Sequence, residues 1–251
     1  MMNEIVGKDA VSDRPLVEAL LRDGVTVLPA VFSSQELSEM RDIVLSNMAL
    51  LKNTRPTKSS RHLAGFHQYP VLEGLHAKLT GSRPIRAFLE SVFGHQSFRT
   101  IGLSDITINR SQPWHTDLLR GKYATFVENR VEWAAESVGI YKALVYLQDS
   151  SSLQVAKGSH RQSRSLENDD HAAPSESSEV ARIPVKAGDV VILDIRSAHR
   201  GADEADYISG ARDADPAILV STVFADTGGA LTEALEMGNV HRLSDWRTRH
   251  A

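Results

Sequence analysis

The first fifth of the chain alternates between helical and strand-like spacing of its hydrophobic residues. Apolar positions recur at helical spacing over residues 16–21, and residues 25–28 (VTVL) then read as a short strand that ends before a proline. Ser33 and Glu36 form a capping-box pattern, in which each residue can satisfy a backbone N–H of the other. This pattern predicts a second helix that runs to about Leu51.

Residues 53–110 show three successive patterns of polar and apolar positions. Residues 53–70 are polar and interrupted by Gly and Pro, so we expect a loop there. A further helix is predicted over residues 83–93. Residues 98–110 then alternate between apolar and polar positions, as a half-buried strand does.

The remainder of the chain reads mostly as short strands. Residues 161–180 are polar and Ser-rich, and we expect a flexible loop there. Several short strands after a helical N-terminal third predict a mainly β fold, a β-sandwich or jelly roll, with flanking helices. We expect one domain over residues 1–251, with a helical part at about 14–95, a jelly-roll core at about 98–225 and a C-terminal tail at 226–251. The strand candidates are residues 139–148, 153–156, 181–185, 189–195 and 216–224.

Composition restricts the chemistry. The chain has no cysteine and ten histidines, so a metal site or acid–base chemistry must use His with Asp or Glu. The net charge of −4 lacks the basic excess of a nucleic-acid-binding protein, which favours a small-molecule substrate. No signal peptide and no long apolar stretch is evident, so we expect a soluble, cytoplasmic protein with no membrane contact, as a monomer or homodimer.

One short motif points to a metal. His115 and Asp117 follow a predicted strand, and residues two apart in an extended chain face the same side. His-x-Asp alone is a common pattern that also occurs at the surface near strand ends. A second histidine, His199, follows the apolar strand at 189–195 and lies 84 residues (199 − 115) after the first. Two histidines and one carboxylate leave positions open on a metal, as in non-haem Fe(II) oxygenases.

Four segments together resemble a known family. They are LLRDGVTVLPAVFSSQEL, PWHTD, LVYLQDSSSLQVAKGSHR and AGDVVILDIRSAHRG, and they extend over most of the chain. In sequence and order they are similar to the phytanoyl-CoA dioxygenase-like (PhyH-like) family of Fe(II)/2-oxoglutarate-dependent oxygenases. The resemblance implies a double-stranded β-helix, or cupin-like jelly roll. It also implies that His115, Asp117 and His199 bind Fe(II), with 2-oxoglutarate and O2 as cosubstrates.

The family binds the distal carboxylate of 2-oxoglutarate with an arginine about ten residues after the second histidine, near the start of the next strand. The candidate here is Arg212, at a longer spacing than expected, with Arg200 and Lys142 as substitutes. A guanidinium suits this task because it meets a carboxylate in bidentate geometry. Thr107 and Asn109 lie at even steps before the metal motif, so we expect that face of the strand to line the cosubstrate site.

Substrate contacts are expected from two irregular segments. Their basic groups suit an anionic substrate such as a carboxylate, although solvated loop charges are the alternative for each residue. The candidates are Arg61, His62, Phe66 and His67 in residues 58–69, and Arg120 and Lys122 in residues 118–133.

The resemblance also implies a reaction. Members that halogenate replace the metal-binding carboxylate with a small residue, so Asp117 favours hydroxylation of a C–H bond, or a related desaturation or cyclisation. We expect a small metabolite as substrate, amino-acid-like or an intermediate of natural-product biosynthesis. Two alternatives stay open: a cupin-like metal enzyme that does not use 2-oxoglutarate, and a jelly-roll binding module without catalysis.

Overall fold

The chain folds around a large antiparallel sheet. The computed structural model describes residues 13–55, 58–166, 173–208 and 215–250. The seven-stranded sheet has the order β1-β8-β5-β10-β4-β2, with β3 paired to β10 beside this path. Its strands are β1 (Val25–Leu28), β2 (Arg61–Ala64), β3 (Phe98–Thr100), β4 (Asp105–Ile108), β5 (Ile140–Tyr146), β8 (Val190–Asp194) and β10 (Ile218–Asp226).

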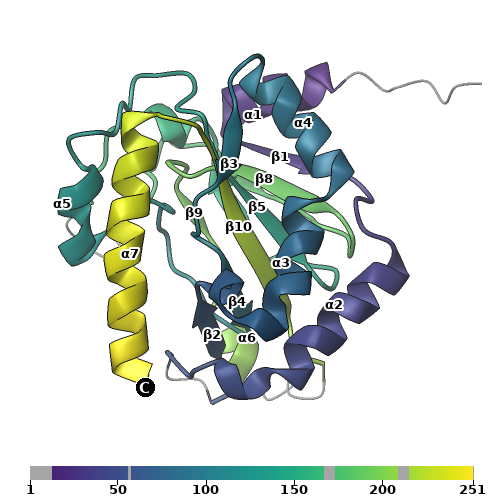
Figure 1. Ribbon diagram of the computed structural model, residues 1–251. Helices are drawn as coiled ribbons and strands as arrows, with labels where there is room; N and C mark the ends of the chain where they lie inside the picture. The colour runs from purple at the N-terminus through teal and green to yellow at the C-terminus, as the bar shows by residue number, and fades with distance from the viewer. Residues whose placement is uncertain (1–12, 56–57, 167–172, 209–214, 251) are drawn as a thin grey trace, which may run out of the picture.

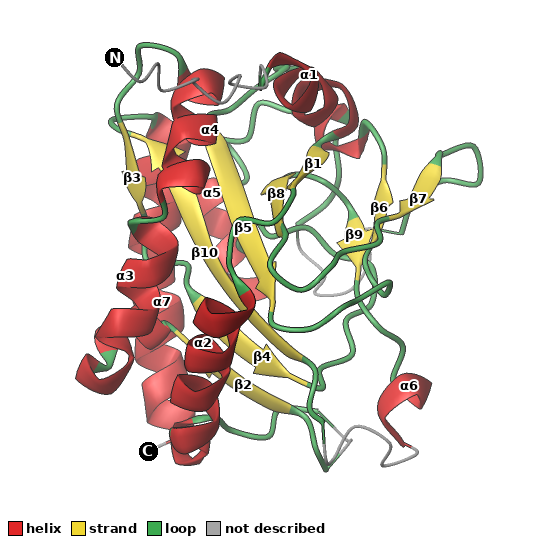
Figure 2. Cartoon of the chain, turned by 90° about the vertical axis from the view of Figure 1, so that its right-hand side faces the viewer, coloured by secondary structure: helices red, strands yellow, loops and turns green. Residues whose placement is uncertain are grey.

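A smaller sheet faces the large one. It has the order β7-β6-β9, with β6 (Gln154–Ala156), β7 (Val180–Arg182) and β9 (His199–Arg200). A backbone bridge between His115 and His199 adds the chain around His115 to this sheet. Figure 2 shows the small sheet on one side of the large one and helices on the other. The arrangement is the predicted jelly roll with flanking helices.

The helices α2, α3 and α4 cover the outer face of the large sheet (Figure 1). The predicted capping box is present at the start of α2, where the Ser33 N–H donates to Glu36 Oε2 over 2.8 Å and the Glu36 N–H donates to Ser33 Oγ over 3.3 Å. The helices are α1 (Arg14–Asp23), α2 (Ser34–Ser46), α3 (Glu73–Thr80), α4 (Arg83–Phe93), α5 (Ala124–Val127), α6 (Ala205–Ile208) and α7 (Ala230–His250). Short 3-10 helices are η1 (Met48–Leu50), η2 (Phe66–Gln68), η3 (Pro70–Leu72), η4 (Gly121–Tyr123) and η5 (Ser159–Arg161).

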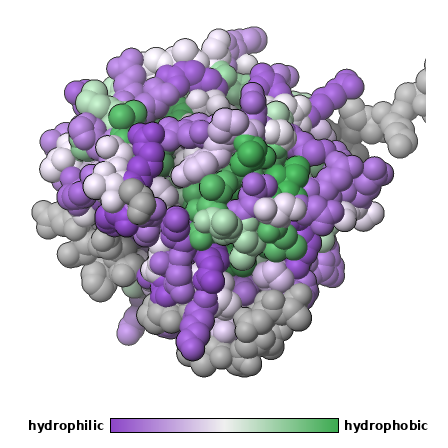
Figure 3. Space-filling view, turned by 60° about the horizontal axis from the view of Figure 1, so that its bottom comes forward, coloured by the Kyte–Doolittle hydropathy of each residue, from purple (hydrophilic) through white to green (hydrophobic). Residues whose placement is uncertain are grey.

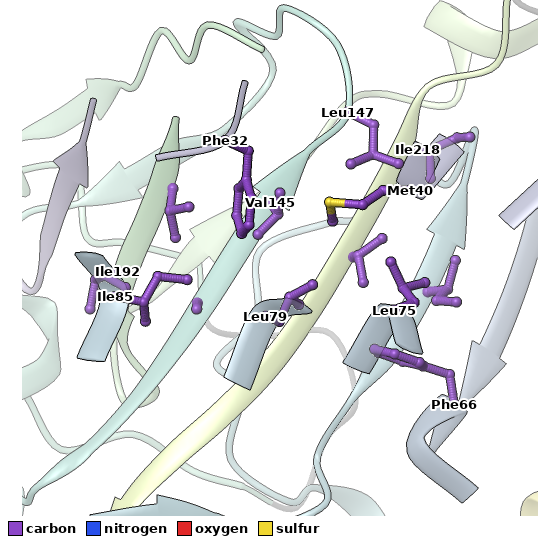
Figure 4. Close-up of a cluster of buried hydrophobic side chains, with 14 of the residues drawn as sticks. Phe32, Met40, Phe66, Leu75, Leu79, Ile85, Val145, Leu147, Ile192 and Ile218 are labelled. Atoms are coloured by element: carbon purple, nitrogen blue, oxygen red, sulfur yellow. The ribbon is translucent and has the colours of Figure 1, made fainter. Parts of the chain in front are cut away.

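The strand alternation separates a hydrophobic core from a polar interior. On β10, Ile218 and Val220 pack against the helices, whereas Leu219 and Ser221 line a cavity between the two sheets. Figure 4 shows the core as interlocked side chains from the sheet and from α2, α3 and α4. The core therefore holds the sheet rigid on one face and leaves the other face free to carry polar chemistry.

Several sequence expectations differ from the structure. Within the expected loop at 53–70, residues Arg61–Ala64 form β2, which pairs with β4. Four residues carry too weak a hydrophobic pattern to stand out without their partner strand. The single strand expected at 98–110 is two strands, because Gly102 takes a left-handed conformation (φ +72°) between β3 and β4.

The expected C-terminal tail is the long helix α7 (Figure 1). Its buried residues Leu235, Leu243 and Trp246 are widely spaced, which weakened the helical signal in the sequence. The helix packs against β2 through Leu243 and Trp246, which surround Ala64. The segment predicted as a C-terminal tail thus contributes side chains to the wall of the cavity.

The surface is mixed in polarity. Figure 3 shows one face as mainly hydrophilic, with a hydrophobic area ringed by polar side chains. Among the described residues, no helix is long and apolar enough to cross a membrane.

Candidate metal centre

Three side chains from two backbone segments converge inside the jelly roll. His115 and His199 exchange backbone hydrogen bonds of 2.8 and 2.9 Å, and the Asp117 N–H donates to the Ile195 carbonyl over 2.9 Å. One ligand atom from each of His115, Asp117 and His199 lies within 4.8 Å of the others. The sheet backbone therefore fixes the spacing of the three candidate ligands.

The imidazole rings have a defined orientation. Nδ1 of His115 lies 2.8 Å from the Pro113 carbonyl oxygen, and Nδ1 of His199 lies 3.0 Å from the Ser197 carbonyl oxygen. A carbonyl can only accept, so each Nδ1 carries the proton and donates it. Burial lowers the pKa of both histidines, which keeps them neutral. Each Nε2 is left with a free lone pair, as a metal ligand requires.

The carboxylate of Asp117 has one oxygen occupied and one free. The Lys142 ammonium donates to Oδ1 over 2.7 Å. Oδ2 is buried without a hydrogen-bond partner among the described residues and lies 3.5 Å from Nε2 of His199. Burial alone would raise the pKa of Asp117, but the charge and hydrogen bond of Lys142 hold it far below its ordinary value. The aspartate is thus an anion that presents one oxygen to the histidines.

The donor set fits a divalent metal. A buried carboxylate oxygen without a partner is costly, and a cation between it and the two Nε2 atoms satisfies all three. Two imidazole nitrogens and one carboxylate oxygen are the donors of the facial triad of non-haem iron enzymes. His115, Asp117 and His199 are therefore the residues that can hold a metal.

The triad opens into a cavity of about 610 Å3 between the sheets. This volume falls within the range of small-molecule sites, roughly 300–1,000 Å3. Its walls come from both sheets, from the chain on either side of the His115 motif and from the C-terminal half of α7. The site can therefore admit an organic ligand next to the metal ligands.

The residues predicted to contact the cosubstrate have different positions. Thr107 lines the cavity. Asn109 does not, and its side-chain oxygen accepts from the Ala217 N–H over 2.8 Å, which fastens β4 to the start of β10. Lys142 lines the cavity and is bound to Asp117. Arg212 lies outside the described residues, and Arg200 pairs with Asp203 away from the cavity.

The predicted substrate residues of the 58–69 segment are mostly turned elsewhere. His62 lines the cavity, with its ring 4.7 Å from that of Trp246. Arg61 donates to backbone carbonyls of Lys58 and Ser60 instead. Phe66 is fully buried in the core of Figure 4. The His67 ring lies outside the cavity, 5.5 Å between centroids from the tilted ring of His76. The 3-10 helix η2 turns Phe66 and His67 toward the core and α3, so the structure does not bring these two predicted residues to the cavity.

In the 118–133 segment, Arg120 lines the cavity and Lys122 does not. Lys122 forms an ion pair with Asp245 of α7 at the surface. Tyr123, next to it, donates to Asp245 over 2.5 Å and also lines the cavity. The contact of this segment with α7 explains why neighbouring basic residues take different positions.

Sequence reasoning missed residues brought in by α7 and by the segments before the two motifs. Arg242 of α7 donates to both oxygens of Asp105 at 3.1 and 3.2 Å inside the cavity. Arg55 and Arg110 also line it. Asp105 lies on the same strand face as Thr107, so the alternation of that strand was the available signal. For Arg242 the sequence holds no signal, because its partner Asp105 lies 137 residues away on another element.

The chain belongs to the phytanoyl-CoA dioxygenase (PhyH) family, whose profile matches residues 20–204. The resemblance of the four sequence segments is thereby confirmed. A comparison with curated proteins found no match. The family, the jelly roll and the His-Asp-His triad together support oxygenase-type chemistry that depends on iron and 2-oxoglutarate.

Several solved structures share the fold of this chain, and two of them are enzymes of nogalamycin biosynthesis. The epimerase SnoN from nogalamycin biosynthesis superposes with a TM-score of 0.63 at 16% identity, covering 85% of this chain and 82% of that one. The carbocyclase SnoK from the same biosynthesis has a TM-score of 0.60 at 16% identity, with 85% and 84% covered. HygX from Streptomyces hygroscopicus, with nickel, 2-oxoglutarate and hygromycin B bound, has a TM-score of 0.57 at 18% identity, with 86% and 88% covered. At these identities the likeness establishes the fold.

Proposed function

We propose that this protein is a non-haem Fe(II)- and 2-oxoglutarate-dependent oxygenase that hydroxylates a C–H bond of a small metabolite. The observation that carries the proposal is the triad itself. Asp117 Oδ2 is buried and unpartnered within the described structure, and it faces two histidines whose Nδ1 protons are engaged elsewhere. A metal ion satisfies all three ligands at once.

The chain's residues divide the work. His115, Asp117 and His199 would hold the iron, and Lys142 keeps Asp117 ionised and fixes its orientation through Oδ1. When bound, the iron supplies the oxidation of a C–H bond by O2, with 2-oxoglutarate converted to succinate and CO2 and one oxygen atom transferred to the substrate. The cavity walls exclude bulk water and orient the substrate beside the metal ligands.

The carboxylate at position 117 supports hydroxylation over halogenation. A metal that keeps three protein ligands has no protein-derived position free for chloride, which argues against halogenation. SnoN and SnoK are described as an epimerase and a carbocyclase. Their fold is shared with this chain, so desaturation and ring closure are the related outcomes to test beside hydroxylation.

The group that binds the distal carboxylate of 2-oxoglutarate remains a prediction. The predicted residue, Arg212, lies outside the described residues. The strand that follows, β10, reads ILVSTVFAD and contains no arginine or lysine. A cation for this carboxylate must therefore come from another element or from the segment before β10.

The proposal is tested by anaerobic addition of Fe(II) and 2-oxoglutarate. We expect a weak visible absorption band in the wild-type protein and its loss in the His115→Ala variant. O2 is then admitted with a panel of amino acids, modified amino acids and natural-product intermediates, and succinate and product mass are measured. Gain of one oxygen atom indicates hydroxylation, and loss of two hydrogen atoms indicates desaturation or ring closure.

Two results would contradict the proposal. A folded protein that gives no band with Fe(II) and 2-oxoglutarate would favour a binding module without catalysis. A protein that binds the metal but forms no succinate in the presence of O2 and any substrate would favour a metal enzyme that does not use 2-oxoglutarate.

A further inference from the structure

The cavity wall is strongly cationic. Among the described residues that line it, six side chains are cationic and two are carboxylates. The cationic residues are Arg55, Arg110, Arg120, Lys142, Arg242 and Arg249, and the carboxylates are Asp105 and Asp117. Both carboxylates are already engaged, Asp117 by Lys142 and Asp105 by Arg242. Positive charge is left over beside the metal ligands.

Arg110 and Arg55 carry this excess. The Nε of each is buried and has no hydrogen-bond partner within the described ranges, and neither guanidinium forms an ion pair with a described residue. The hydroxyl of Thr54, which lines the same cavity, is also buried and has no partner in the described part of the chain. Burial and then the nearby charge of Arg55 lower the pKa of Arg110 to about 10. Two like charges held together in a buried wall are unfavourable unless an anion lies between them.

The local fold explains why Arg110 is turned inward. Asn109 takes a left-handed conformation (φ 45°), and its backbone and side chain both bond Ala217 at the start of β10. The chain then crosses to the small sheet, where the Gln112 N–H donates to the Ala202 carbonyl. Arg110 lies in this crossing, beside the start of the strand that itself contains no cation. Its position is therefore set by backbone contacts.

We propose that Arg110 and Arg55, with the Thr54 hydroxyl, form a binding site for a carboxylate group of a ligand that occupies the metal cavity. A guanidinium matches the two oxygens of a carboxylate, and two guanidinium groups with one hydroxyl provide the donors that a buried carboxylate needs. The site is inferred from the set of hydrogen-bond donors that have no partner among the described residues, and it does not require the metal. Which carboxylate it takes rests on the proposed function: either the distal carboxylate of 2-oxoglutarate or an acid group of the primary substrate.

The first experiment tests the site without metal. Glutarate and succinate are titrated calorimetrically into the metal-free wild-type protein and into the Arg110→Met variant. We expect saturable binding by the wild type and a loss of affinity of about 10- to 100-fold in the variant. Arg61→Met is the matched control, because Arg61 donates to backbone carbonyls outside the cavity, and it should bind like the wild type.

Folding of the variant is followed at the same time. Removing an unpaired buried cation relieves its repulsion from Arg55, so Arg110→Met should melt at the same or a higher temperature than the ligand-free wild type. Equal dicarboxylate binding by the wild type and Arg110→Met, or no binding by the wild type, would overturn the proposal. A variant that melts lower and retains dicarboxylate binding would show that Arg110 is a structural residue.

The second experiment identifies the source of the carboxylate. Anaerobic Fe(II) protein is titrated with 2-oxoglutarate and with 2-oxopentanoate, which has the same chain length but no distal carboxylate. If Arg110→Met weakens 2-oxoglutarate alone, the site binds the cosubstrate. If both 2-oxo acids bind as in the wild type while dicarboxylate binding is lost, the site binds an acid group of the primary substrate. A wild type with no visible band contradicts the proposed function and leaves the first experiment as the test of the site.

Discussion

For each candidate metal ligand, the hydrogen bond to its second polar atom decides which atom is left for the metal. The carbonyls of Pro113 and Ser197 accept hydrogen bonds from the Nδ1–H groups of the two histidines. Lys142 donates a hydrogen bond to one oxygen of Asp117. The sequence predicted the three ligands, because their types and spacing are visible along the chain. It could not predict the role of Lys142, whose partner lies 25 residues away.

His62 makes the stability of the fold dependent on pH. Burial, together with Arg110, lowers its pKa to about 4, against the opposing effect of Asp105. Below the ordinary histidine pKa of about 6.5, the unfolded chain binds a proton at this position and the folded chain does not, so stability falls as pH falls. From pH 7 to pH 5 we expect this residue to remove about 2 kcal/mol from the free energy of unfolding.

Urea unfolding at the two pH values measures the effect. The wild type should lose about 2 kcal/mol more of its free energy of unfolding between pH 7 and pH 5 than His62→Asn does, because the variant lacks the titrating group. His95→Asn, at an exposed position, should keep the wild-type pH dependence. A wild-type to His62→Asn difference that is constant with pH would contradict the low pKa of His62.

Among the elements, α7 joins the cavity wall to the sheet. Its Arg242 bonds both oxygens of Asp105 on β4, and Trp246 contacts the ring of His62 on β2. The strands β5, β8 and β10 were predictable because their apolar runs are long. Neither β2 nor α7 could be predicted from the sequence, because β2 is short and the apolar residues of α7 are far apart. Their structure is decided by the partners they pack against.

Arg242 is expected to be the main polar contact that holds α7. Burial alone would raise the pKa of Asp105, and Arg242 with His62 instead holds it well below its ordinary value. Arg242→Met leaves this carboxylate without its main counter-charge. Because both side chains are about one-fifth exposed (19% and 20%), we expect a loss of about 2 kcal/mol in the free energy of unfolding, less than for a fully buried pair.

Urea denaturation of Arg242→Met, with Arg247→Met as the control on the exposed face of the same helix, checks this value. The control should change stability by less than about 0.5 kcal/mol. Equal effects of the two substitutions would show that Arg242 does not fasten the helix.

The whole molecule carries a net negative charge, whereas the charge of the cavity wall is positive. The chain carries −4, yet the described wall of the cavity is cationic. Carboxylates on the outer surface repel anions weakly at physiological ionic strength, since charges more than about 8 Å apart are screened. A small anion therefore meets the field of the cavity only near its mouth. The composition predicts the sign of the net charge of the whole molecule, but it cannot predict the sign of the charge around the site.

Metal and cosubstrate should stabilise the whole fold, because only the folded chain brings the three ligands together. Ni(II) at roughly 100 times its dissociation constant should by itself add about 2.7 kcal/mol, or about 5–10 °C in melting temperature. Scanning calorimetry measures the shift, and a chelator should reverse it. His115→Ala should show no shift and His95→Ala the full one. An equal shift in both variants would place the metal elsewhere.

The backbone bridge between His115 and His199 also means that the metal site forms only when two distant segments of the chain have folded together. The two residues are 84 positions apart (199 − 115), and β9, which carries His199, also pairs with β6 from the intervening chain. Bringing together distant parts of a chain is the slow step for folds of this kind. A newly made chain therefore has no complete iron site until its second half has folded. Metal binding by this triad therefore requires that both segments have folded against each other.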